Sequence, residues 1–163
     1  MKAALIHQGG GGVEVVNNMS KPTPGPCDAI IKVKAAVVGD LDVLFARGLF
    51  PEIISKSNIP AGRVFSGVVE SVGVKVREIV VGDDVCGVLP ADGSCGGAFS
   101  EFVCAPRHCL VKRPSPSSGG DPLSWETSAV VAHVGVAALS ALHFKLKVSP
   151  GDLMVVTDAA SPV

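Results

Sequence analysis

Glycine and proline interrupt the first part of this chain so often that no long helix fits there. The sequence holds 19 glycines and 12 prolines, and both residue types end regular secondary structure. The apolar stretches between them are short, and one alternates Ile31, Val33 and Ala35 with lysines, which is typical of a strand with one face in water. We therefore expect strands at Ala3–His7, Val13–Val16, Asp28–Val38, Val64–Val72, Asp84–Leu89, Phe99–Cys104 and Cys109–Val111.

Many short strands of this kind predict a closed or sandwich-like β unit, with the first two strands forming a hairpin. A short helix is expected at Leu41–Arg47, where apolar residues recur at helical spacing and Gly48 follows. The pattern changes after the Pro/Ser/Gly-rich loop at 114–120. There Ser124 can cap a helix whose stretch Ala129–Leu142 is nearly all apolar or small, so we expect this helix to be covered on most sides. The apolar segment Leu153–Thr157 predicts a strand of the type found inside parallel sheets.

Composition and charge exclude several classes of function. The 14 basic and 15 acidic residues nearly cancel, and the chain has no basic run, so neither a nucleic acid nor a membrane is an expected partner. The apolar start is too short for a signal peptide, which predicts a cytoplasmic location. Five cysteines with no C-x-x-C pair do not fit a disulfide framework or a four-cysteine zinc lobe. The simpler interpretation is that these cysteines are free thiols in a reducing compartment.

Several short motifs occur in an order and at spacings that together resemble one family. They are Gly67–Gly73, Val81–Gly87, Gly96–Val103, Leu123–Glu126, Gly135–Leu142 and Ser149–Asp152. On these motifs the chain resembles the medium-chain dehydrogenase/reductases, and within them the zinc-free quinone oxidoreductase-like (zeta-crystallin-like) branch. The resemblance implies a mainly β (α+β) fold. A GroES-like β-barrel with short helices is expected over residues 1–122, and a connecting helix with the first strand of an incomplete Rossmann domain over 123–163.

The same resemblance implies an oxidoreductase that passes hydride from NADPH to a quinone or enone held between two domains. Zinc-dependent relatives place a cysteine where this chain has Gly39, and a His-Glu pair where it has Arg63 and Val64. Since none of these three residues is a usual zinc ligand, we expect no catalytic metal.

The resemblance also places a small set of residues near the cleft. Asp42 either caps the short helix or relays a proton, and Arg47 and Arg63 either meet an anionic group or are simply solvated. Leu44 replaces a tyrosine common in quinone reductases. The cleft candidates are thus Asp42, Leu44, Arg47 and Arg63, and those on the nicotinamide side are Gly39, Asp40 and Ala137.

The glycine-rich dinucleotide fingerprint is expected after Leu153–Thr157, but Asp158–Val163 does not complete it. We therefore expect the chain by itself to be inactive. The alternative is a non-catalytic protein, either a truncated isoform or a diverged relative, that binds a partner through the surface a Rossmann domain would have covered. In that case Leu153–Val156 would be an unpaired strand open to a homodimer or another protein.

Overall fold

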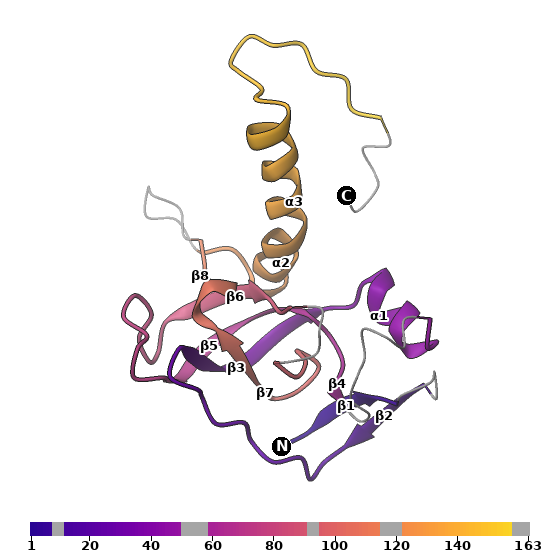
Figure 1. The fold of residues 1–163 in the computed structure, drawn as a ribbon, viewed down its shortest axis with the longest axis vertical. Helices are drawn as coiled ribbons and strands as arrows, with labels where there is room; N and C mark the ends of the chain where they lie inside the picture. The colour runs from indigo at the N-terminus through magenta and orange to yellow at the C-terminus, as the bar shows by residue number, and fades with distance from the viewer. Residues whose placement is uncertain (8–11, 50–58, 91–94, 115–121, 158–163) are drawn as a thin grey trace.

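The structure, a computed structural model, describes residues 1–7, 12–49, 59–90, 95–114 and 122–157. Two antiparallel sheets form the lower part of the molecule in Figure 1. The smaller sheet has the order β2-β1-β4 and consists of β1 (Ala3–Ile6), β2 (Val13–Val16) and β4 (Ile59–Pro60). The predicted hairpin is confirmed, because Ala3 pairs with Val16 and Ile6 with Val13. The short strand β4 was not expected from the sequence.

The larger sheet has the order β7-β3-β5-β6-β8 and curls into a barrel-like wall (Figure 1). Every neighbouring pair in it is antiparallel. Its strands are β3 (Asp28–Val37), β5 (Val64–Val72), β6 (Asp84–Val88), β7 (Phe102–Pro106) and β8 (Leu110–Lys112). A single turn of 3₁₀-helix, η1 (Arg107–Cys109), joins β7 to β8. The mainly β fold predicted from the sequence is confirmed.

The strand predicted at Phe99–Cys104 begins three residues later than expected. Bends flank Ser100, whose single hydroxyl hydrogen is shared between the carbonyl oxygens of Gly97 and Phe102, at 2.8 and 2.9 Å. These side-chain hydrogen bonds compete with ladder pairing and delay the strand. Ser100 keeps only an isolated bridge to Ala3, which links the two sheets.

One hydrophobic core lies inside the larger sheet. Its buried side chains come from all five strands and from the loops on either side of β6 and before β7, and include Phe65, Ile31, Val69, Val85 and Ile79. Along β3 the exposed Lys32 alternates with the buried Ile31, as the sequence pattern indicated. A second, smaller cluster of Ile6, Phe45 and Ala61 holds α1 (Asp40–Ala46) against the smaller sheet.

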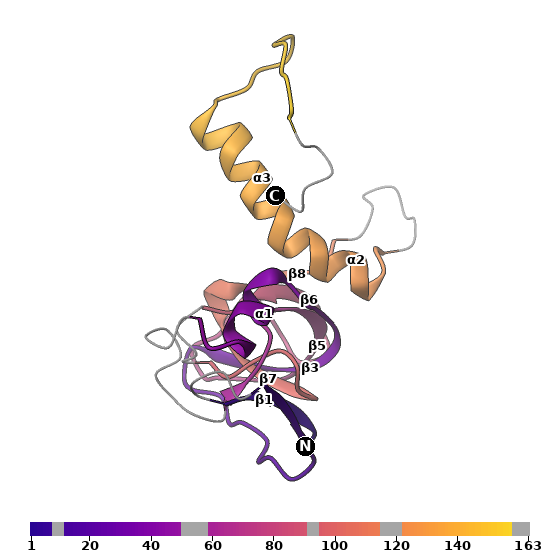
Figure 2. The same ribbon diagram turned by 90° about the vertical axis from the view of Figure 1, so that its right-hand side faces the viewer.

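A continuous helix rises from the barrel and stands largely apart from it (Figures 1 and 2). It comprises α2 (Trp125–Val130), the π-helical turn η2 (Val131–Gly135), α3 (Val136–Leu139) and a second π-helical turn η3 (Ser140–Lys145). Ser124 caps it as predicted, because its hydroxyl oxygen accepts a hydrogen bond from the Thr127 amide at 3.1 Å.

The prediction that this helix is covered on most sides is wrong. Only its base packs on β3, β5 and β6, where Ala129 and Ala132 are buried. Further along, Val136, Leu139 and Phe144 are 62%, 59% and 66% exposed. The physical reason is that no second layer faces the helix within the described residues, so its apolar composition is not matched by burial.

The strand predicted at Leu153–Thr157 is also absent from the described residues. The segment is irregular and exposed throughout, because a parallel strand forms only beside partner strands and none lies next to it here. Its expected continuation at 158–163 lies outside the described residues. The domain boundary expected between residues 122 and 123 stays a prediction.

By length and composition alone, the helix Trp125–Lys145 could cross a membrane. One such helix is weak evidence, since core helices of soluble proteins pass the same criterion.

Candidate functional site

The strand register brings most of the predicted site residues to one edge of the larger sheet. Val37 at the end of β3 lies opposite Val64 at the start of β5, and Val64 lies opposite Val88 at the end of β6. Gly39 follows β3 by two residues, and Arg63 immediately precedes β5. The α1 residues and Arg63 therefore share this edge, which we call the strand-end edge.

Asp42 acts as a local cap in this structure. Its Oδ2 accepts a hydrogen bond from the Gly39 amide at 2.8 Å, and Asp40 and Asp42 both lie in the first turn of α1. Negative charge is favourable at that end of a helix. This geometry supports the capping interpretation of Asp42 over the proton relay.

Arg63 is held firmly by a single residue of the neighbouring strand end. Its Nε and Nη2 donate to the Leu89 carbonyl oxygen at 3.1 and 3.0 Å, and the Leu89 amide donates to the Arg63 carbonyl at 2.8 Å. The side chain is half-buried. A guanidinium fixed in this way presents a permanent positive charge at the strand-end edge.

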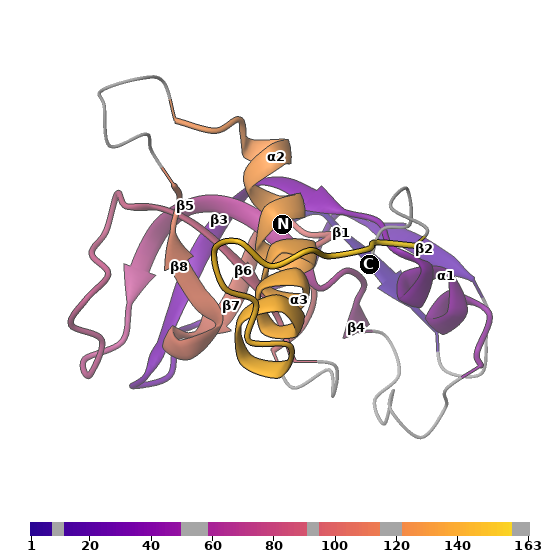
Figure 3. The ribbon, with the colours of Figure 1, turned by 90° about the horizontal axis from the view of Figure 1, so that it is seen from above.

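The remaining predicted residues are less closely grouped. Leu44 is half-buried on α1, and Arg47 is exposed at the end of that helix. Ala137 lies on α3, above the helix base, whereas α1 lies to one side of it when the molecule is seen from above (Figure 3). The structure therefore brings together the α1 residues and Arg63 but places Ala137 on a separate element.

Two cavities lie elsewhere on the barrel. The larger, about 370 Å³, is a wide depression lined by residues that include Lys2, Phe99 and Glu101. The smaller, about 70 Å³, lies between the N-terminus and β7. Neither contains a predicted site residue, and size alone does not make the larger one the site of chemistry.

Sequence reasoning missed the contacts that fasten the helix to the barrel. Arg113 Nη1 donates to the Leu123 carbonyl at 2.8 Å, and its Nη2 pairs with Asp84 Oδ2 at 2.5 Å. Its guanidinium also lies 3.9 Å above the centre of the Trp125 ring. The Ser66 hydroxyl donates to the Trp125 carbonyl at 2.6 Å. We call these five residues the helix joint; their wide separation in sequence gave no signal for it.

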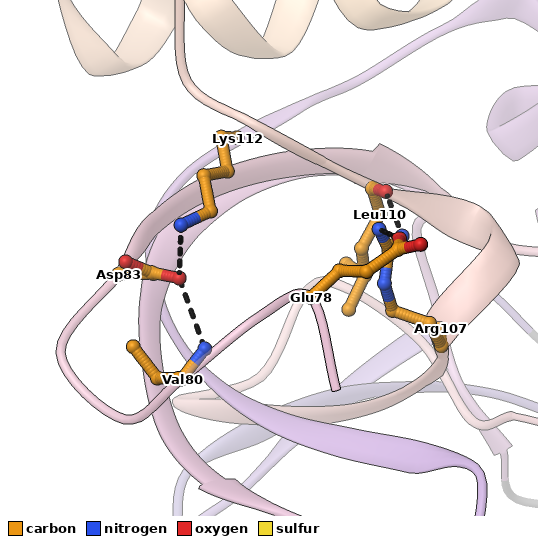
Figure 4. A network of polar contacts seen from close by, with 6 residues as sticks. All are labelled: Glu78, Val80, Asp83, Arg107, Leu110 and Lys112. Carbon is orange, nitrogen blue, oxygen red and sulfur yellow. Dashed lines mark hydrogen bonds and ion pairs between the residues drawn. The ribbon is translucent and has the colours of Figure 1, made fainter. Parts of the chain in front are cut away.

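A second polar network ties the loop before β6 to β8 (Figure 4). Asp83 Oδ2 accepts from the Val80 amide at 2.9 Å and pairs with Lys112 Nζ at 2.9 Å. These contacts, the backbone amide first, lower the pKa of the Asp83 carboxyl. Arg107 pairs with Glu78 and donates to the Leu110 carbonyl at 2.8 Å. The network is structural, because its side chains bond to one another and to backbone.

Among the described residues, no group of three or more His, Cys, Asp or Glu side chains is placed to hold a metal ion. The expected independence from zinc stays a prediction.

The chain matches a known family of domains. Residues 25–115 match the family described as "Alcohol dehydrogenase GroES-like domain", and the chain belongs to that family. Its relatives further place it among the quinone oxidoreductase- and enoyl reductase-like members of the medium-chain dehydrogenase/reductases.

Two curated relatives and one solved structure show the likeness. Quinone oxidoreductase-like protein 1 of Mus musculus is 32% identical over 80% of this chain and 35% of its own length. The 2-haloacrylate reductase of a Burkholderia species is 31% identical over 97% of this chain and 46% of its own length. A mycobacterial protein solved in complex with NADPH has a TM-score of 0.73 and 28% identity, covering 93% of this chain and 44% of that one.

The chain thus spans between about a third and a half of the length of these curated relatives.

Proposed function

We propose that, in the complete protein, this chain supplies the substrate side of a zinc-independent, NADPH-dependent reductase of quinones or enones. The observation that carries the proposal is the 31% identity to 2-haloacrylate reductase over 97% of this chain. An acrylate is an alkene conjugated to a carboxylate, and it is therefore an activated alkene of the same chemical class as an enone. A cytoplasmic location belongs to the same proposal.

Arg63 is the residue best suited to meet such a substrate. Reduction of a quinone or enone develops negative charge on an oxygen atom, and a fixed cation stabilises that charge without having to reorganise. Arg63 is already fixed by its two hydrogen bonds to the Leu89 carbonyl. At the same position a zinc-dependent relative would need a metal ligand, which a guanidinium does not provide. This supports independence from zinc.

The described residues do not fit NADPH as a whole. Its pyrophosphate needs a glycine-rich turn between a strand and a helix. Residues 153–157 are instead irregular and exposed, and no helix follows them in the described part of the chain. Gly39, Asp40 and Ala137 remain the proposed nicotinamide-side residues, and the rest of the cofactor would be bound by other parts of the complete protein.

The cofactor part of the proposal is tested by titrating NADPH into this chain and into the complete protein while nicotinamide fluorescence is followed. We expect the complete protein to bind and the isolated chain to leave the fluorescence unchanged. Micromolar binding by the chain alone would contradict the proposal that it lacks a cofactor site.

The substrate part is tested in the complete protein with Arg63→Met and Arg63→Lys. We expect Arg63→Met to lower kcat/KM for an enone at least tenfold, as loss of an oxyanion-stabilising group does, and Arg63→Lys to restore part of it. Arg77→Met is the matched control, because Arg77 is exposed and, among the described residues, its side chain donates to the nearby Val74 carbonyl. Equal activity of the Arg63→Met and Arg77→Met variants would refute the role of Arg63.

A second candidate function is favoured by the exposed apolar segment at residues 153–156. Leu153 and Val155 are 99% and 83% exposed, and apolar surface of this kind is a common site of association. As a non-catalytic module, the chain would bind a second copy of itself there. Light scattering after gel filtration should then show a dimer that Leu153→Asp with Val155→Asp converts to monomer. A wild-type chain that is monomeric at all concentrations excludes this candidate.

A further inference from the structure

Arg63 is a half-buried cation without an anionic partner in the described part of the chain. Three of the five arginines are half-buried, and they are Arg63, Arg107 and Arg113. Arg107 pairs with Glu78 and Arg113 with Asp84. Arg63 bonds instead to a neutral acceptor, the Leu89 carbonyl oxygen. A cation that is partly removed from water is favoured beside an anion, so this position suits an anionic ligand.

The carboxylates at the strand-end edge do not neutralise Arg63. Asp42 accepts a hydrogen bond from the Gly39 amide. It lies with Asp40 in the first turn of α1, where the helix itself favours negative charge. Neither carboxylate is among the ion pairs of the described residues. The charge of Arg63 is thus available to a ligand.

The unused part of the guanidinium can bind a carboxylate through two donors. The bonds to Leu89 come from Nε and Nη2 of Arg63, which lie along one edge of the group. Arginine has five N–H donors, and the other three form no hydrogen bond with any described residue. They are both hydrogens of Nη1 and one of Nη2, which together form a fork that fits the two oxygen atoms of a carboxylate.

The backbone around Arg63 is also held in place before any ligand binds. The Leu89 amide donates to the Arg63 carbonyl at 2.8 Å, and the Ala98 amide donates to the Gly62 carbonyl at 2.9 Å. The next residue, Val64, is paired in the larger sheet. A group that is fixed in advance loses little conformational freedom when it binds a ligand, which favours affinity.

We propose that Arg63 binds the carboxylate of the substrate, so that the preferred substrates are α,β-unsaturated carboxylates. This inference rests on the proposed reductase function and names the substrate class of the same site. A carboxylate carries one negative charge, which one guanidinium balances, whereas a phosphate monoester carries nearly two at neutral pH. Because the carboxylate is conjugated with the alkene, the negative charge that develops during reduction reaches oxygen atoms that Arg63 already contacts.

The test uses the complete protein and two pairs of compounds that differ in charge but hardly in shape. Reduction is compared for 2-butenoate and 2-butenamide, and binding, by titration calorimetry, for their saturated analogues butyrate and butyramide. We expect the wild type to favour the acid at least tenfold in kcat/KM and in affinity, because hydrogen bonds to a charged group are strong. Arg63→Met should lose both preferences. Arg63→Lys, which keeps the charge but not the fork, should keep part of them, and the control Arg77→Met should behave like the wild type.

Binding and reduction separate this inference from the proposed function. Equal affinity of the wild type for butyrate and butyramide would overturn the carboxylate site, even if an enone is reduced and the reductase function holds. Binding of butyrate that depends on Arg63, without reduction of an enone or of either butenoic compound, would support the site and exclude the reductase.

The phosphates of NADPH are the other anions that could occupy the fork. We expect Arg63→Met to bind NADPH like the wild type, with folding checked by circular dichroism. Weakened NADPH binding with an unchanged preference for the acid would assign Arg63 to the cofactor and overturn the proposal. If Arg63→Met does not fold, the acid preference of the wild type and its decrease in Arg63→Lys decide the question.

Discussion

Arg113→Met should loosen the base of the long helix from the barrel, because Arg113 makes three of the contacts in the helix joint. The substitution keeps much of the apolar stem but removes the ion pair with Asp84, the hydrogen bond to the Leu123 carbonyl and the stacking on Trp125. The side chain of Arg113 is only 11% exposed, whereas that of Asp84 is 40% exposed. The ion pair is therefore partly screened by solvent, and the hydrogen bond to the Leu123 carbonyl is exposed as well.

The size of the effect follows from these contacts. The exposed hydrogen bond to the Leu123 carbonyl contributes about 1 kcal/mol, the cation–π contact about 1 and the half-exposed ion pair about 0.5. The guanidinium also has a cost, because its Nε is buried without a hydrogen-bond partner in the described part of the chain. The expected net loss is about 2 kcal/mol, which for a chain of this size lowers the melting temperature by roughly 4–8 °C.

Trp125 makes the measurement direct, since it is the only tryptophan in the sequence and lies in the joint itself. Thermal unfolding should be followed by tryptophan emission and, separately, by far-ultraviolet circular dichroism. We expect Arg113→Met to shift the emission of the folded protein to longer wavelength and to lower the midpoint of the fluorescence transition, with Arg113→Lys intermediate. Arg77→Met is the control. If Arg113→Met melts like the control with unchanged emission, the joint contributes nothing and our reasoning is wrong.

Four further predictions concern the barrel and the helix. Phe65→Ala should lower the free energy of unfolding by about 3–5 kcal/mol, because Phe65 is fully buried in the core; denaturant unfolding measures this. Gly97→Ala should cost more than about 2 kcal/mol, since its Cβ would collide with the Pro60 carbonyl. Gly135→Ala, at a helical position, should instead stabilise the helix by about 0.5–1 kcal/mol, because the Val131 side chain, whose Cγ1 would lie 3.3 Å from the new Cβ, is partly exposed and has room to shift. The Asp83 carboxyl has a lowered pKa, so its stabilising contribution should be present at neutral pH. It should be lost as the pH falls below the ordinary value of 3.8.

Each of these predictions has an outcome that would contradict it. Phe65→Ala is compared with Val74→Ala at an exposed position, and similar losses for both would refute the core assignment. Gly97→Ala should lower and Gly135→Ala should raise the free energy of unfolding, and changes in the same direction would contradict the glycine predictions. For the carboxyl, the difference in stability between wild type and Asp83→Asn should disappear in acid, and a difference that is independent of pH would exclude the ionised Asp83 as its source.

Alternation and turn residues were enough to predict the barrel strands. The lysines of β3 identified its solvent-exposed face. Gly48, with a φ of +73°, follows the end of α1 as expected. The late start of β7 was not predictable, because it depends on Ser100 bonding to local carbonyls. A two-residue strand such as β4 has no periodicity to detect.

The errors at the C-terminal end have a common cause. The apolar character of Ala129–Leu142 and Leu153–Thr157 was identified correctly, but composition states only that a surface favours burial. What covers that surface depends on other segments. The site prediction was limited in the same way. The register of β3, β5 and β6 brings Gly39, Asp42 and Arg63 together, whereas the position of Ala137 depends on the direction of the helix, which the sequence does not indicate.

The helix points away from the barrel, so a small movement at the helix joint is amplified along the length of the helix. The helix Trp125–Lys145 has 21 residues, so it is about 30 Å long at 1.5 Å per residue. Within the described residues it packs on the barrel at one end only, so a rotation at that end moves the other end the most. By this geometry, a tilt of about 10° at the joint displaces the far end by roughly 5 Å. Misplacing reacting groups by about 1 Å can cost a hundredfold in rate. A substitution at Arg113 or Ser66 would thus be felt most strongly by whatever is attached at the other end.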